Sequence, residues 1–463
     1  MTFNHNSIQD FSTQISGKLI QPSDAAYDEA RQLYNGMIDK KPALIVKARN
    51  VHDVVAAVNF ARENAVTLAV RGGGHNGAGL GSVDDGLVLD LGDINHVEVQ
   101  ANGRFVKVGG GATFGEVDAT TVPQGLVIPG GVISSTGVGG LTLGGGMGYF
   151  SRKYGLTVDH LRRATVVLAD GSVVTASADE HPNLFWGLRG GGGNFGIVVE
   201  FVFEAQPTDT VLAGPVFWDI SEAEAVMQWY RKFIVDAPED LYGFFAFLTV
   251  PPGPPFPEHL HGQVVAGIVW SYSGPKDKAD EVLAPIRNFG SPIMDGIQEM
   301  PVTVLNGMFD ALYPPGLQWY WRGDFFDELN DEAIALHLEH GTKLPTGFST
   351  MHLYPINGAA GRVGQQETAF SYRDAVWSAV YAGVDPDPAN AELIRDWTVN
   401  YYEALHPHSM GGAYVNFMME EGPSRVKATY RDNYERLAAV KAQYDPTNFF
   451  SVNQNVRPVK EFA

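Results

Sequence analysis

The sequence predicts an α+β protein of two domains, because an early βαβ unit is followed by a change of composition near residue 206. The chain has 463 residues and 44 % apolar content, enough for more than one hydrophobic core. Its 53 glycines are concentrated in the first 200 residues, whereas aromatic pairs such as Phe217-Trp218 are frequent later. We therefore expect a ligand-gripping domain over 1–206, a second domain over 207–425 and a C-terminal segment over 426–463.

The first domain is expected to begin with a helix and the βαβ unit. Acidic residues lie early in the stretch 23–37, where a helix dipole favours them. Residues 43–46 and 66–70 are apolar runs typical of strands, and Asn50 caps a helix between them. Further expected elements are strands at 87–91, 96–99 and 105–108, a helix at 113–121, a hairpin of 164–168 with 173–176, and a strand at 197–203.

The second domain is expected to mix strands with helices. The expected strands are 245–250, 264–270 and 349–354, and the expected helices are 222–235, 276–287, 327–340 and 390–405. A last helix over 430–442 leads to Asn453-Gln454-Asn455, a tail too specific in composition for a loose end.

Charge and cysteine content exclude several classes of protein. The formal net charge of −21 at pH 7 disfavours nucleic acid and anionic membrane surfaces as partners. The chain has no cysteine, so it cannot form disulfides, which fits a cytoplasmic protein. No run approaches the roughly 20 apolar residues that span a bilayer. The first residues, Met1 to Asn6, lack the pattern of a signal peptide, and no His, Asp and Glu spacing indicates a metal site.

Glycines cluster in three stretches, 72–81, 130–148 and 190–196, and the first surrounds a single histidine, His75. Successive backbone N–H groups form concave anion sites, so phosphate is the usual guest of such loops. The pattern GxGxxG occurs in the first and third stretches, but neither match is followed by a helix, which excludes a Rossmann turn. Two interpretations remain: a nucleotide cradle made of loops, or tight turns in a glycine-rich β domain.

Several motifs together resemble the berberine bridge enzyme-like flavoproteins, which belong to the vanillyl-alcohol-oxidase type of FAD-linked oxidases. They are Arg71-Gly72-Gly73-Gly74-His75-Asn76, Gly137-Val138-Gly139-Gly140 with Gly144-Gly145-Gly146, the segment 152–160, the segment 184–196, and Asn453-Gln454-Asn455. The match extends from about residue 20 to the end, and bacterial members are similar in length. The resemblance implies a PCMH-type FAD-binding domain of two α/β subdomains. It also implies a substrate domain with an antiparallel sheet flanked by helices, and a C-terminal segment that returns to the FAD domain.

Taken alone, His75 could be a solvent-facing loop histidine, but the resemblance further implies that FAD is bound covalently through it. In this family the histidine of the glycine loop is bonded to the 8α-methyl of the flavin, which raises the flavin potential and retains the cofactor. Many relatives add a link from a cysteine, whose position Ile133 takes here, so a cysteinyl link is excluded. The other cofactor-binding residues implied by the motifs are Arg71, Gly72, Gly73, Gly74, Asn76, Gly77, Gly79, Leu80, Val132, Thr136, Gly137, Gly139, Gly140, Gly144, Gly145, Gly146, Gly148, Tyr149, Gly155, Leu156, Asp159, Gly196, Ile197, Val198, Asn453 and Asn455.

Catalytic residues are sought in the substrate domain, since an oxidase of this type needs a group that removes a proton from the substrate OH or NH. Tyr414 and Asn416 resemble the family segment Tyr-x-Asn, and Tyr414 is the first candidate for a base or an orienting hydroxyl. Phe417 replaces a second tyrosine, which argues against a two-tyrosine base. His352 is the alternative base, because strand alternation places it on one face with Thr350 and Tyr354. A buried tyrosine with a purely structural hydroxyl is the other interpretation of Tyr414.

The resemblance implies a small-molecule oxidase that takes a hydride from an alcohol, amine or phenolic substrate onto flavin N5 and reduces O2 to hydrogen peroxide. The alternative is a flavin enzyme of a biosynthetic pathway that transfers oxygen or performs an oxidative rearrangement. A third possibility is a ligand-binding protein without a cofactor. The expected assembly is a monomer or a homodimer. Aromatic residues around 319–326 indicate a flat or ring-containing substrate or, as the alternative, simply contribute to a core.

Overall fold

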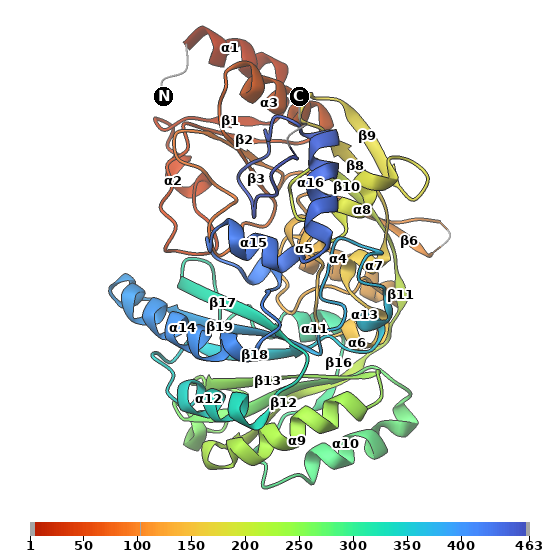
Figure 1. Ribbon diagram of the computed structural model, residues 1–463, viewed down its shortest axis with the longest axis vertical. Coiled ribbons are helices and arrows are strands. Elements are labelled where there is room, and N and C mark those ends of the chain that lie inside the picture. Colours follow the sequence, from red (N-terminus) through yellow and green to blue (C-terminus); the bar gives the residue numbers. More distant parts are fainter. Residues whose placement is uncertain (1–4, 102, 460–463) are drawn as a thin grey trace.

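The computed structural model describes residues 5–101 and 103–459 and has three main sheets, of which the first two occupy the upper part of the view and the third occupies the lower part (Figure 1). The N-terminal residues were predicted to lack a signal peptide, and the first of them, Met1 to Asn4, lie outside the described part of the chain. The mixture of helices and sheets confirms the predicted α+β class.

The first sheet has the strand order β1-β2-β4-β3 and contains the predicted βαβ unit. β2 (Leu44–Lys47) and β3 (Leu68–Arg71) both run parallel to β4 (Leu87–Asp90), which lies between them. β1 (Lys18–Ile20) is antiparallel to β2. The helix α3 (Val51–Glu63) begins at Asn50, whose side chain accepts the N–H of Asp53 at 3.1 Å, so the predicted cap is confirmed.

The predicted helix over 23–37 is wrong, because only α2 (Tyr27–Ala30) is helical there. The chain beyond α2 bonds across the molecule instead of along a helix. Tyr34 donates its N–H to the Gly74 carbonyl, and the Asn35 amide donates to the carbonyls of Gly77 and Trp319 at 2.8 and 3.0 Å. These contacts place 34–36 between the histidine loop and the third sheet, and they outweigh a weak local preference for helix.

The second sheet is antiparallel, in the order β5-β6-β10-β8-β9. Its strands are β5 (Val97–Val99), β6 (Phe105–Gly109), β8 (Leu161–Val167), β9 (Val173–Ser177) and β10 (Ile197–Glu204). The predicted hairpin of β8 and β9 is confirmed, with Gly171 at φ 85° in its turn. The predicted helix α4 (Phe114–Thr121) begins with a capping box between Thr113 and Glu116.

The third sheet is antiparallel and has the order β15-β12-β14-β13-β18-β19-β17, with β16 beside β12. The strands are β12 (Val211–Asp219), β13 (Leu241–Thr249), β14 (Val264–Tyr272), β15 (Met294–Asp295), β16 (Gln298–Met300), β17 (Gln318–Phe326), β18 (Thr350–Pro355) and β19 (Trp377–Asp385). Helices α9 (Ala223–Asp236), α10 (Ala279–Arg287), α12 (Asp331–Gly341) and α14 (Ala391–Leu405) contribute to the core on one face.

Strand alternation gives the two faces of this sheet different roles. Phe245, Met351 and Leu353 belong to the core beneath the helices. Their neighbours Phe244 and Tyr354 belong to a second core that also contains Tyr149 and Phe150 of the N-terminal part. The inner face of the sheet therefore packs on the glycine-rich part of the chain.

The end of the chain crosses back to the N-terminal part, where α16 (Asn433–Tyr444) packs against α8 (Pro182–Leu188), as Figure 1 shows in blue and yellow. The fully buried Lys441 ammonium donates to the carbonyls of Asn194 and Phe450 at 2.7 and 2.8 Å and pairs with the equally buried Asp445. This contact fixes the tail beside the third glycine cluster.

The remaining helices and short strands are α1 (His5–Gln14), β7 (Leu126–Val127), α5 (Val138–Gly144), α6 (Ser151–Tyr154), α7 (Thr157–His160), β11 (Gln206–Pro207), α11 (Val302–Asn306), α13 (Ala359–Arg362) and α15 (Pro423–Tyr430).

The buried pair Asp118 and Asn306 joins α4 to α11 and is expected to make the free energy of unfolding depend on pH. Burial raises the pKa of Asp118 to about 7, although the Asn306 amide donates to its Oδ2 at 2.6 Å. Between about pH 4 and 7 the folded protein keeps a proton that the unfolded chain has lost, so the free energy of unfolding falls as pH rises, by about 4 kcal/mol in all.

Asp118→Asn is expected to remove this slope and to stabilise the protein at pH 8. The new amide has no proton to lose, and it can donate to Asn306 Oδ1, which is buried without a hydrogen bond among the described residues. Urea denaturation at pH 5 and pH 8 measures the effect. An unchanged pH slope in the variant would show that Asp118 is not its source.

Candidate cofactor and substrate site

The three glycine clusters meet at one cavity that lies between the N-terminal part and the inner face of the third sheet. One end is lined by glycine backbone, at Gly72, Gly73, Gly74, Gly110, Gly131, Gly137, Gly139, Gly140, Gly192, Gly193 and Gly196. The other end is lined by Phe309, Tyr313, Trp319, Trp321, Thr350, His352, Tyr354, Val380, Ala382 and Phe417. The site therefore has a backbone-lined half and an aromatic half.

The glycines of the backbone-lined half have two roles: some allow two loops to pack closely, and others leave space in the cavity. A Cβ added at Gly73 would lie 2.4 Å from the Gly137 nitrogen, so no side chain fits where the first two clusters touch. At Gly140 and Gly193, by contrast, a Cβ would meet nothing within 4 Å. A long groove of exposed backbone N–H groups is what a dinucleotide such as FAD requires, so the residues present fit this cofactor. This convergence favours the nucleotide cradle over unrelated tight turns.

His75 lies in this cavity as a neutral imidazole. Burial lowers its pKa to about 4. The Tyr34 ring stacks on it with centroids 3.9 Å apart, and its Nε2 lies 3.0 Å from Ser135 Oγ. An uncharged ring keeps a lone pair on one nitrogen, as a nucleophile requires.

Tyr414 and Asn416 lie together above the second glycine cluster. The Tyr414 hydroxyl accepts the N–H of Gly146 at 3.0 Å and an N–H of the Asn416 amide at 2.8 Å. Burial raises the pKa of Tyr414 to about 12, against the opposing effect of these two bonds. A hydroxyl with both lone pairs engaged stays protonated at neutral pH and presents its own proton. It is better suited to orienting a substrate than to removing a proton.

His352 faces the aromatic half from β18, where Thr350 and Tyr354 also line the cavity, as alternation predicts. Its Nδ1 lies 2.6 Å from the Tyr354 hydroxyl. Burial lowers the pKa of His352 to about 3 and raises that of Tyr354. The imidazole is therefore neutral and able to accept a proton, with Tyr354 fixing its orientation.

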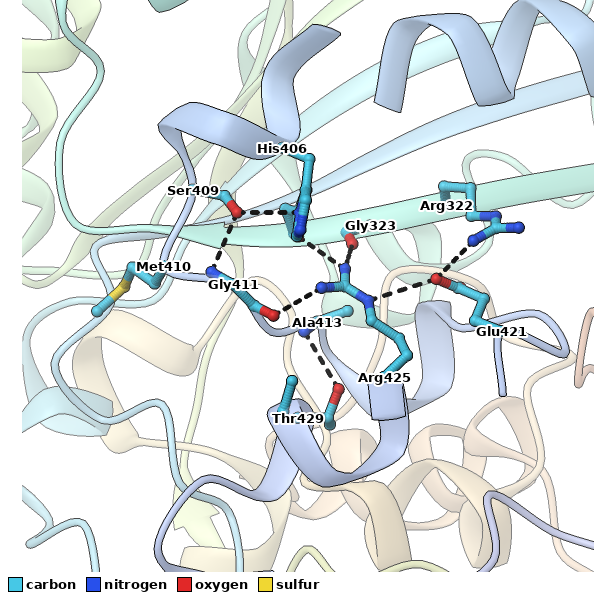
Figure 2. A network of polar contacts seen from close by, with 12 residues as sticks. Arg322, Gly323, His406, Ser409, Met410, Gly411, Ala413, Glu421, Arg425 and Thr429 are labelled. Carbon is cyan, nitrogen blue, oxygen red and sulfur yellow. Dashed lines mark hydrogen bonds and ion pairs between the residues drawn. The ribbon is translucent and has the colours of Figure 1, made fainter. Parts of the chain in front are cut away.

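A buried ionic network holds the segment that carries Tyr414 (Figure 2). The Arg425 guanidinium pairs with Asp324 at 2.7 Å and donates to the carbonyls of Gly323 and Gly411 at 2.6 and 2.8 Å. Glu421 lies 3.4 Å from Arg425 and 2.8 Å from Arg322. The Asp324 side chain is fully buried and that of Glu421 is 1 % exposed, so both carboxylates depend on these partners.

Replacing Arg425 with methionine is expected to lower the free energy of unfolding by about 3–5 kcal/mol, because it leaves a buried carboxylate without its main partner. Denaturation in urea, followed by tryptophan fluorescence, measures the loss. Arg395→Met is the matched control, since Arg395 is 48 % exposed and pairs with the 64 % exposed Asp396. That change should cost less than about 1 kcal/mol. Equal losses in the two variants would contradict a stabilising role for the network.

Some residues that the motifs imply for cofactor binding do not line the cavity. These are Gly77, Gly79, Gly144, Gly145, Gly146, Gly148, Tyr149, Gly155, Leu156, Asp159 and Asn455, whereas the others reach it, as do Tyr414, His352 and Asn416. Gly144 supports the site from behind, since a Cβ there would lie 2.5 Å from the Asn416 amide. Asp159 is engaged by Arg373 at 2.7 Å. Arg71 lies at the cavity, but its guanidinium bonds to the carbonyls of Ala30 and Gln32 and to Asp90.

Sequence reasoning missed two residues that contact His75 directly, Tyr34 and Ser135. Ser135 lies within the second glycine cluster, and a polar side chain at that place was the sequence feature that could have identified it as a site residue. Tyr34 had none, because its own surroundings were predicted to be helical.

Comparison with known proteins agrees with this site. The family described as FAD binding domain matches residues 42–177, and the family described as berberine and berberine like matches residues 413–457. The fold and the cradle thus define an FAD-linked oxidoreductase. The chain is 31 % identical to the FAD-linked oxidoreductase YgaK of Bacillus subtilis, over 97 % of this chain and 98 % of that one. It belongs to the berberine bridge enzyme-like FAD-linked oxidases.

Solved structures support the same assignment. The 6-hydroxy-D-nicotine oxidase of Arthrobacter nicotinovorans is 25 % identical, with a TM-score of 0.85 over 96 % of this chain and 98 % of that one. The glucooligosaccharide oxidase of Acremonium strictum, described with a 6-S-cysteinyl, 8α-N1-histidyl FAD, is 25 % identical, with a TM-score of 0.84 over 99 % and 100 %. The PCMH-type FAD domain and the antiparallel sheet flanked by helices, both predicted from the resemblance, are confirmed.

The described residues contain neither a helix that could span a membrane nor a cluster that could bind a metal. None of their helices is both long and apolar enough to cross a bilayer. Within the same ranges, 5–101 and 103–459, no group of three or more His, Asp and Glu side chains could hold a metal ion.

Proposed function

We propose that the protein is an oxidase that holds FAD through a single bond to His75. It oxidises a small alcohol, amine or phenolic substrate and reduces O2 to hydrogen peroxide. The observation that carries this proposal is the position of the half-buried, neutral His75 in a backbone-lined cradle that continues into an aromatic cavity. FAD, when bound, supplies the hydride acceptor and the reaction with O2. In this proposal residues 1–206 and 426–463 hold the cofactor and residues 207–425 hold the substrate.

The side chains of the aromatic half divide the remaining work. His352 accepts the proton of the substrate OH or NH, since its neutral ring makes one hydrogen bond within the described residues, through Nδ1. Tyr414 donates its hydroxyl proton toward the substrate and thereby orients it, and the Asn416 amide holds Tyr414 in place.

The substrate of this proposal is uncharged. The residues that line the aromatic half include no Asp, Glu, Lys or Arg, so an ion would lose hydration without gaining a partner. A substrate analogue that carries a carboxylate is therefore expected to bind at least about tenfold more weakly than its neutral counterpart, a difference of about 1.4 kcal/mol. Inhibition constants of such a pair measure the effect. Equal inhibition by the two would contradict an uncharged site.

Two measurements test the proposed function. Acid precipitation should leave the yellow colour in the protein pellet, and extractable flavin would contradict the bond to His75. A substrate screen, followed by anaerobic bleaching of the flavin, identifies the substrate. Peroxide should then form in near-stoichiometric amounts with substrate consumed, whereas a low yield would favour oxygen transfer or oxidative rearrangement.

A further inference from the structure

Two adjacent serines of the second glycine cluster point to different partners. Ser134 bonds through its hydroxyl and its N–H to Asp310 of the segment after α11. Ser135 bonds to the His75 ring at 3.0 Å. A turn fixes this geometry, in which the Thr136 N–H donates to the Ile133 carbonyl at 3.2 Å. The backbone therefore aims one hydroxyl at the imidazole and holds the other away from it.

The environment of His75 restricts which nitrogen carries its single proton. Burial lowers the pKa of His75, and the backbone of Ser135 opposes this by favouring a proton on the ring, so we assign the proton to Nε2, the nitrogen that faces Ser135. The ring thus faces Ser135 as a donor. The Tyr34 ring, stacked at an interplanar angle of 19°, resists rotation of the imidazole that would exchange its two nitrogens.

We propose that Ser135 is a positioning residue for cofactor attachment: it accepts the Nε2–H of His75 and so keeps the nucleophilic lone pair at Nδ1. Attachment forms the bond from Nδ1 to the 8α carbon. Two protons are released, one from the methyl group and one from Nε2, and the latter passes to the Ser135 hydroxyl as that hydroxyl gives up its own proton to water. Two electrons leave with them, and O2 takes up both electrons and both protons as hydrogen peroxide. The linked imidazole ends without charge.

This inference rests on the proposed covalent bond, and its test separates the two. Full-length protein, produced without flavin in a riboflavin-starved host, is mixed with FAD in air and quenched with acid at intervals. Flavin fluorescence of the denatured protein in a gel then reports the covalent fraction, and flavin bound before quenching reports affinity. Ser135→Ala is expected to bind FAD but to attach it about tenfold more slowly, as for the loss of one hydrogen bond.

Matched variants decide the outcome. Ser134→Ala should attach FAD at the rate of the unchanged protein, because its hydroxyl bonds to Asp310 instead of His75. Ser135→Thr keeps a hydroxyl and should stay within about threefold of that rate, which also covers the case that the alanine variant does not fold. The role of Ser135 would be overturned if Ser135→Ala attached FAD at the rate of the unchanged protein. It would also be overturned if Ser135→Thr attached FAD as slowly as Ser135→Ala. Unchanged protein that attaches no flavin at all would instead overturn the proposed function.

Discussion

His352→Gln is expected to lower kcat/KM by about 10²–10⁴, the usual contribution of a group that takes a proton in the transition state. Glutamine is close in size and can still bond to Tyr354, but it has no basic nitrogen. The flavin content and the free energy of unfolding should remain near their original values, since His352 lies in the aromatic half of the cavity. Anaerobic reduction of the flavin by substrate, measured by stopped flow, isolates the affected step.

Two other variants show whether the loss is specific. His259→Gln, in the exposed part of the short helical turn Glu258–Leu260, should leave kcat/KM unchanged. Tyr414→Phe removes an orienting hydroxyl and should cost about tenfold, as for one hydrogen bond. If Tyr414→Phe proved far more damaging than His352→Gln, the two residues would have to exchange roles, with Tyr414 as the base.

The second large effect is expected from His75→Ala, which should reduce the acid-stable flavin from nearly all to none. The cradle formed by the glycine clusters is unchanged in this variant, so FAD should still bind, but reversibly. We expect a flavin content that falls on dialysis and is restored by added FAD. The activity of the reloaded variant should be at least about tenfold lower, because loss of the covalent bond lowers the flavin potential.

The control for this variant is His96→Ala. His96 is 49 % exposed and pairs with Glu200 at 3.3 Å on the second sheet, outside the cavity. It should keep the acid-stable flavin in full. Flavin that stayed bonded in His75→Ala would show that another residue carries the bond.

The parts of the site that sequence reasoning found depend on local patterns. The spacing of Thr350, His352 and Tyr354 follows from the period of a strand, so their common face could be predicted. The glycine clusters were visible in composition, and motif resemblance joined them to His75. The features it missed arise from contacts between distant segments. Tyr34 reaches His75 over 41 residues and Ser135 over 60, and no local propensity encodes such pairings.

The fold was predicted well where an element is long and amphipathic, and poorly where tertiary contacts compete with it. The helix capped at Asn50 was predicted because its cap and its apolar face agree. The prediction of a helix over 23–37 was wrong because acidic residues are compatible with both a helix and a turn. The bonds of Asn35 to two other segments then decided the outcome.

The anchoring of the tail by Lys441 has a consequence for biosynthesis. Val452, Asn453 and Gln454 line the same cavity as the glycine loop, which is made nearly four hundred residues earlier on the ribosome. The pocket for the flavin is therefore incomplete until this last stretch has left the exit tunnel and α16 has docked. Cofactor loading thus requires the docked tail, and the yellow colour reports chains in which α16 has folded against α8.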